Sequence, residues 1–62
     1  MNRTQILRHL HQQGCAIWRE VAKHTIILNT ANGQVSAVPR HREVNVFLAT
    51  KICRDLGITP LR

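Results

Sequence analysis

The chain has 62 residues, with nine Lys and Arg against three Asp and Glu, so its formal net charge is +6 at pH 7. A chain this short makes one domain, residues 1–62, close to the lower limit for folding without a metal, disulfides or a partner subunit. The basic excess indicates a polyanionic partner, with nucleic acid as the first candidate, and no segment approaches the roughly 20 apolar residues of a membrane span.

The cysteines, the histidines and the start of the chain limit the class of protein further. No apolar signal-peptide core follows Met1, which predicts a cytoplasmic protein. Cys15 and Cys53 form no C-x-x-C pair and are expected to be buried and reduced. His9 and His11 are two positions apart on a predicted helix, a spacing that does not suit zinc, so neither a metal nor a cofactor is expected.

The first predicted element is a helix over residues 5–13. Thr4 is its expected N-cap, Ile6, Leu7 and Leu10 form its apolar stripe, and Gly14 ends it. Its polar side can be an RNA-facing surface or an ordinary solvated face, and the second interpretation is favoured.

A strand is predicted next, over residues 15–20, with Cys15 and Ile17 on one face and Ala16 and Trp18 on the other. Trp18 can stack on a base. With no tyrosine and one phenylalanine, however, the chain lacks the aromatic array of a single-strand-binding sheet, so a core or sheet-face role is favoured for Trp18.

Two further strands are predicted over residues 24–30 and 34–38. In the strand over residues 24–30, His24, Ile26 and Leu28 are expected to share one face. Asn32-Gly33 is typical of a tight hairpin turn, and Pro39 ends the last strand because it cannot donate to a ladder. Three antiparallel strands in a meander are therefore expected.

The last predicted element is a helix over residues 46–56. Asn45 is its expected N-cap, Phe47 or Leu48 begins its apolar repeat, and Gly57 closes it. The predicted fold is thus α+β in the order α-β-β-β-α, a three-stranded antiparallel sheet with two helices on one face. The other face of the sheet is expected to be at least partly open.

His24 is the main candidate for chemistry. A histidine can exchange a proton near neutral pH, a strand aims it well, and the neighbouring Lys23 suits an anionic substrate. A structural or surface role is the alternative for a lone histidine. The dense polar segment Arg40-His41-Arg42-Glu43 can hold phosphates or can be a solvated connector, and His41 is a second, ambiguous candidate.

The order and spacing of these features resemble a known family. They are Gly14 after the first helix, a strand ending near Arg19, a histidine before the second strand, Val38-Pro39-Arg40-His41, and the final Ile52-Cys53-Arg54-Asp55-Leu56-Gly57-Ile58. Nearly the whole chain resembles the HicA-type (YcfA-like) toxins of bacterial type II toxin–antitoxin systems. The resemblance implies a fold like the double-stranded-RNA-binding domain and an mRNA interferase that a HicB-type antitoxin holds inactive.

The resemblance also implies roles for single residues. The family's catalytic histidine lies in a Gly-Ser-His or Gly-Gly-x-His motif and matches His24, whereas Val21-Ala22 stand where the family has glycine or serine. Either the loop tolerates this change or activity is weakened or lost. The expected enzyme is a metal-independent endoribonuclease, monomeric when free of antitoxin. Its expected RNA-binding residues are Arg19, Lys23, Arg40, His41, Arg42, Lys51 and Arg54.

Two other functions remain open. The same basic fold can grip duplex RNA without cleaving it, as a non-catalytic module or a degenerate toxin relative. The chain can also act chiefly as the partner of an acidic protein that covers His24, which is compatible with a toxin that is held silent.

Overall fold

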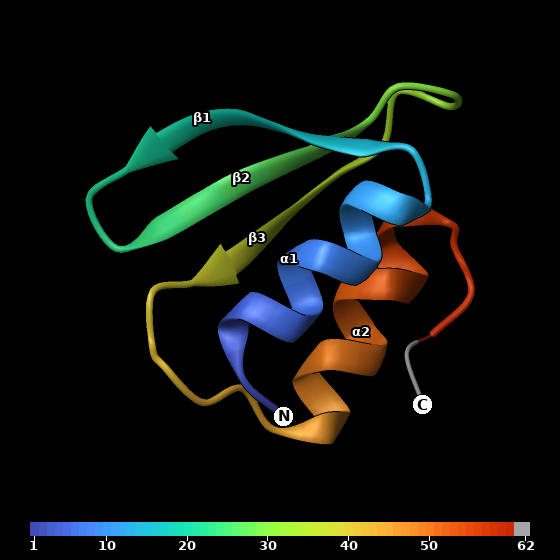
Figure 1. The fold of residues 1–62 in the computed structure, drawn as a ribbon. Coiled ribbons are helices and arrows are strands. Elements are labelled where there is room, and N and C mark those ends of the chain that lie inside the picture. Colours follow the sequence, from blue (N-terminus) through green and yellow to red (C-terminus); the bar gives the residue numbers. More distant parts are fainter. Residues whose placement is uncertain (61–62) are drawn as a thin grey trace.

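The computed structural model describes residues 1–60 of the 62. The elements follow the predicted α-β-β-β-α order (Figure 1). They are α1 (Arg3–Gln12), β1 (Cys15–Val21), β2 (His24–Asn29), β3 (Val35–Pro39) and α2 (Val46–Leu56). None of the helices within residues 1–60 is long and apolar enough to cross a membrane.

Helix α1 begins earlier than predicted because Asn2, and not Thr4, is its N-cap. The Asn2 side chain accepts a hydrogen bond from the backbone N–H of Gln5 at 2.8 Å, and the Gln5 side chain accepts one from the backbone N–H of Asn2 at 3.0 Å. This reciprocal capping box satisfies two backbone donors that would otherwise lack partners. Helix α2 has the predicted ends, with Asn45 as N-cap and Gly57 in the left-handed conformation after the last turn.

The three strands form one antiparallel sheet in the order β1-β2-β3. Val21 pairs with His24 across a two-residue turn, and Gly33, at φ +74°, closes the turn between β2 and β3. Pro39 is itself the last residue of β3, opposite His24. Three-stranded pairing fixes the backbone of β2 on both sides.

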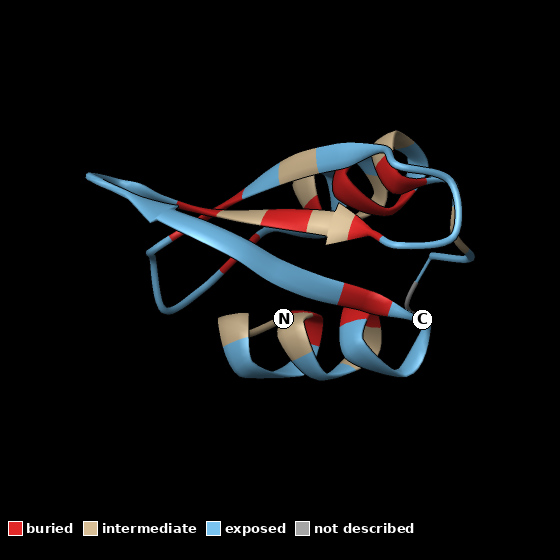
Figure 2. Cartoon of the chain, turned by 90° about the horizontal axis from the view of Figure 1, so that it is seen from above, coloured by how far each residue is buried: buried red, intermediate tan, exposed pale blue. Residues whose placement is uncertain are grey.

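Both helices cover the same face of the sheet, α1 against β1 and α2 against β3 (Figure 1). On β2, Thr25, Ile27 and Asn29 are buried against them, and Figure 2 shows this alternation along the middle strand. The apolar core is formed by Ile6, Leu10, Cys15, Ile27, Val38, Val44, Ala49, Ile52, Cys53 and Leu56. The predicted helix stripes and the predicted burial of both free cysteines are confirmed.

At the start of α2 it is Leu48 that packs against the core, whereas Phe47 is 87% exposed. The opposite face of the sheet carries no helix and is called the open face. It holds His24, Ile26 and Leu28 of β2 with their cross-strand partners, as the alternation predicts.

Strand β1 departs from regular alternation at Trp18. Ile17 pairs with Ile27 and Arg19 pairs with Ile26, so Trp18 is an extra residue in a β-bulge. Cys15 and Ile17 lie on the helix-covered face and Ala16 opposite Leu28 on the open face, as predicted. Beyond the bulge the alternation shifts by one residue, which moves Arg19 and Val21 onto the open face and Glu20 onto the covered one.

Candidate active site

His24 is the first residue of β2 and is exposed on the open face. Its backbone lies between Val21 of β1 and Pro39 of β3, so a paired strand holds it on each side. A side chain on such a backbone keeps its direction better than one on a loop. The imidazole is therefore accessible and is carried by a backbone that two strands hold in place, which suits a proton-transfer group.

The bulge brings a cation to the same face. Arg19 lies opposite Ile26, which is two residues from His24 along β2, or about 7 Å at the usual rise of a strand. Its guanidinium carbon lies 5.0 Å from the centre of the Trp18 ring, which is within the range of a cation–π contact. Without the extra residue, alternation would have turned Arg19 toward the helices.

Lys23 is the second residue of the turn between β1 and β2 and is exposed. It directly precedes His24, so its ammonium group lies at the same end of the sheet. Neither Arg19 nor Lys23 forms an ion pair among the residues that the structure describes. Arg19 on the open face of β1, Lys23 in the turn and His24 at the start of β2 are here called the open-face site.

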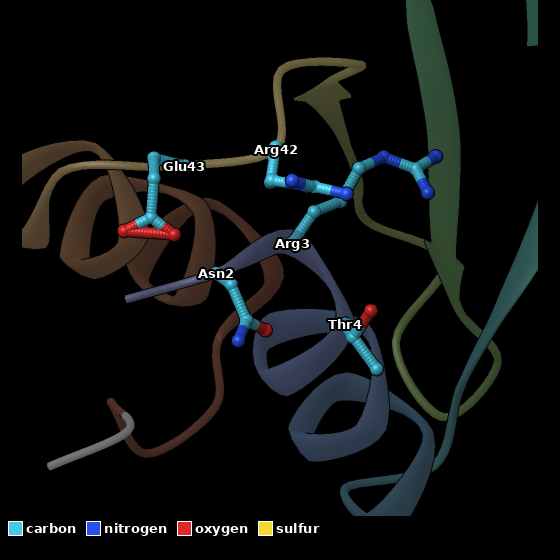
Figure 3. A pocket seen from close by; sticks show the side chains of 5 residues that line it. All are labelled: Asn2, Arg3, Thr4, Arg42 and Glu43. Atoms are coloured by element: carbon cyan, nitrogen blue, oxygen red, sulfur yellow. The ribbon is translucent and has the colours of Figure 1, made fainter.

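Behind this site, on the covered face, lies a hydrogen-bonded network that the sequence did not reveal. The Thr25 hydroxyl donates to Glu20 Oε1 at 2.6 Å, and Arg40 Nη2 forms an ion pair with the same oxygen at 2.8 Å. Arg3 Nη2 donates to Thr25 Oγ1, and Arg3 Nε donates to the Pro39 carbonyl at 3.3 Å. Figure 3 shows Arg3 reaching from the start of α1 toward the sheet.

This network ties together the strand ends that flank His24. Thr25 follows His24 in the chain, and Pro39 is its cross-strand partner. Arg3, Glu20 and Thr25 therefore join the backbone segments next to His24. Arg40, which was predicted to bind RNA, forms an ion pair with Glu20.

The connector after β3 holds two more of the predicted RNA-binding residues, His41 and Arg42. His41 is exposed, and the Arg42 carbonyl accepts a hydrogen bond from the backbone N–H of Arg3 at 2.9 Å. The Arg42 side chain lines an open polar hollow of about 340 Å³ beside the start of α1 (Figure 3). The residues that line the hollow are Asn2, Arg3, Thr4, Arg42 and Glu43.

Lys51 and Arg54 are not brought to the open-face site, since they lie on α2, across the sheet from it. Lys51 Nζ forms an ion pair with Asp55 Oδ2 at 2.8 Å, and the Ser36 hydroxyl donates to the same oxygen at 3.2 Å. The hydrogen bond from Lys51 is the main reason why the pKa of Asp55 is lowered from its ordinary value. The predicted RNA-binding residues therefore fall on both sides of the molecule.

Within residues 1–60, no three His, Cys, Asp or Glu side chains are grouped so that they could hold a metal ion. In comparisons with known proteins, no family model, no curated protein and no solved structure gives a significant match to the chain. The candidate site is consequently defined by this chain's own residues, Arg19, Lys23 and His24.

Proposed function

We propose that the chain is a metal-independent endoribonuclease that cleaves mRNA, of the kind that the HicA-type resemblance implies. The observation that carries this proposal is the open-face site, an exposed histidine on a paired strand, with Arg19 on the same face two positions along and Lys23 next to it in the turn. A net charge of +6 supports a polyanionic substrate, because basic surfaces raise the local concentration of nucleic acid.

The chemistry available to such a site is transfer of the scissile phosphate to the neighbouring 2′-hydroxyl. The 2′-oxygen forms a bond to phosphorus as the bond to the 5′-oxygen breaks, leaving a 2′,3′-cyclic phosphate and a free 5′-hydroxyl. His24 either accepts the proton from the 2′-hydroxyl or donates one to the leaving oxygen. Arg19 and Lys23 stabilise the negative charge that builds up on the phosphoryl oxygens.

A single histidine limits the rate. One acid–base group contributes roughly 10²–10⁴-fold, and the open-face site as assigned contains a single histidine. Turnover is therefore slow and sequence selectivity loose, which still suffices for a toxin whose target is the mRNA pool. We further propose that the protein acts in the cytoplasm, as a monomer until it is bound by a HicB-like antitoxin.

An acidic partner suits the same face. The open face combines Arg19 and Lys23 with the half-exposed side chains of Ile26, Leu28 and Val35. A partner with carboxylates around an apolar patch would cover His24 while matching the positive charge. A short acidic reading frame beside this gene would support the pairing.

The second candidate is an RNA-binding module that does not cleave. It is favoured by Val21, whose side chain stands directly opposite His24 where the family's glycine would leave space. Against it, Ala22 and Lys23 both have negative φ, so the turn does not require glycine for its backbone. Incubation with RNA in excess chelator separates the two candidates, because only the first predicts products that vanish in His24→Ala.

A further inference from the structure

The bulge in β1 places the chain's only tryptophan beside the open-face site. We propose that Trp18, backed by Arg19, is a stacking platform for an unpaired base of the RNA, one nucleotide away from the phosphate at His24. This inference rests on the proposed function, because it uses the same open face of the sheet and the same ligand, RNA. It adds the substrate class, which is single-stranded or looped RNA rather than a continuous duplex.

The first step is the geometry of the bulge. Ile17 and Arg19 pair with consecutive residues of β2, Ile27 and Ile26, so Trp18 and Arg19 together oppose Ile26. In a regular strand two adjacent side chains point to opposite faces. The 5.0 Å contact between the Arg19 guanidinium and the Trp18 ring therefore places both side chains on one side.

The second step is exposure. Trp18 keeps 56% of its surface open, although burying an indole is among the largest apolar gains available to a small core. Arg19 covers one side of the ring, and an indole covered on both sides could not remain so exposed. One face of the ring is therefore free for a ligand, and the cation behind it limits the ring's motion before binding.

The third step is what the free face would accept. Each base that stacks on an aromatic side chain adds affinity whatever its identity, because every base has a π-face. The bases inside a duplex are already stacked on one another and cannot reach a platform on a sheet. Arg19 lies next to the platform and Lys23 lies in the turn beyond His24, so both can hold phosphates of a strand that runs from Trp18 past His24.

The fourth step is spacing. Ile26 and His24 are separated by two residues of β2, about 7 Å, which is comparable to the step between adjacent nucleotides of an extended strand. A base on Trp18 therefore leaves the neighbouring phosphate within reach of His24. The platform would set which phosphate is presented to the imidazole.

The experiment uses the protein's own fluorescence, since Trp18 is the sole tryptophan and the chain has no tyrosine. The probe is a short 2′-O-methyl oligoadenylate, which is unpaired and lacks the attacking hydroxyl, and the control probe is an abasic oligomer of equal length and charge. We expect the oligoadenylate to quench the emission and the abasic oligomer to leave it nearly unchanged. Equal quenching by both probes would overturn the platform.

Binding of the same two probes by variants, followed through a dye on the probe, completes the test. Trp18→Ala should weaken oligoadenylate binding about tenfold or more and leave abasic binding unchanged, whereas Trp18→Phe should keep most of the affinity. An unchanged Kd in Trp18→Ala would contradict the proposal. Because Trp18 is exposed, the variant should fold, and circular dichroism checks this.

The platform and the ribonuclease can fail separately. Cleavage of ordinary RNA by wild type, scored by cyclic phosphate ends and lost in His24→Ala, tests the enzyme and does not depend on the fluorescence. Quenching without cleavage would retain the platform and remove the enzyme. Cleavage with no effect of Trp18→Ala on binding or rate would retain the enzyme and remove the platform.

Discussion

Val21 pairs directly with His24, so an isopropyl group stands beside the imidazole on the open face. The β-bulge at Trp18 produces this relationship, because it turns Val21 outward. In the family that the chain resembles, glycine stands in this segment. The proposed activity should therefore depend on what occupies position 21.

Val21→Gly should raise the rate of RNA cleavage several-fold, since removing the side chain opens the approach of a phosphate to His24. The change should also lower the free energy of unfolding by about 1 kcal/mol, because glycine weakens a strand. Val35→Gly is the matched control, since Val35 is similarly exposed on the open face but pairs with Leu28. A control that speeds cleavage equally would contradict this account.

Thr25→Val tests the network behind the site. Valine has nearly the shape of threonine but cannot hydrogen-bond to Arg3 and Glu20, and Thr25 is fully buried. We expect the free energy of unfolding in urea to fall by about 1–3 kcal/mol, the usual cost of leaving a polar partner unsatisfied. Ser36→Ala, which removes one longer bond to the half-buried Asp55, should cost less. Equal losses in the two variants would argue against a special role for the network.

Lys23→Gln tests which side of the molecule meets RNA. Loss of one phosphate contact should weaken binding of single-stranded RNA and reduce the slope of log K against log salt by about 0.7. Arg54→Gln, which removes an exposed cation from α2 across the sheet, should leave the slope unchanged. The opposite pattern would move the binding surface to the helices.

Cys15 predicts a pH dependence of stability. Burial, assisted by nearby Cys53, raises the pKa of the Cys15 thiol above its ordinary value of 9.0. The unfolded chain therefore loses this proton first, so the folded state binds more protons and stability falls as pH rises above 9.0, by at most about 1.4 kcal/mol per pH unit. In Cys15→Ala this part of the slope should disappear from urea unfolding curves, and an unchanged slope would refute the assignment.

Local signals were enough to predict most of the fold. Asn45 and Gly57 mark the ends of α2, and the alternation in β2 predicts which residues face the helices, because these patterns act within a few positions. The sequence Asn2-x-x-Gln5 also has the pattern of a capping box, although Thr4 was predicted as the N-cap of α1.

The bulge and the polar network could not be predicted from local sequence patterns. A bulge depends on which residues of two strands pair, and nothing near Trp18 signals an extra residue. Arg3 contacts Thr25 and Pro39, which lie 22 and 36 positions away in the chain. Only the folded chain shows that Arg40 is paired with Glu20 and that Lys51 and Arg54 lie across the sheet from His24.

The most direct test of the central claim is the identity of the ends that the purified protein leaves on a long RNA in excess chelator. We compare wild type with His24→Ala and with His41→Ala, whose histidine is exposed on the connector after β3. The account predicts cyclic phosphate or 3′-phosphate ends from wild type and His41→Ala, and intact RNA with His24→Ala. Cleavage that persists unchanged in His24→Ala, or intact RNA with all three proteins, would contradict it.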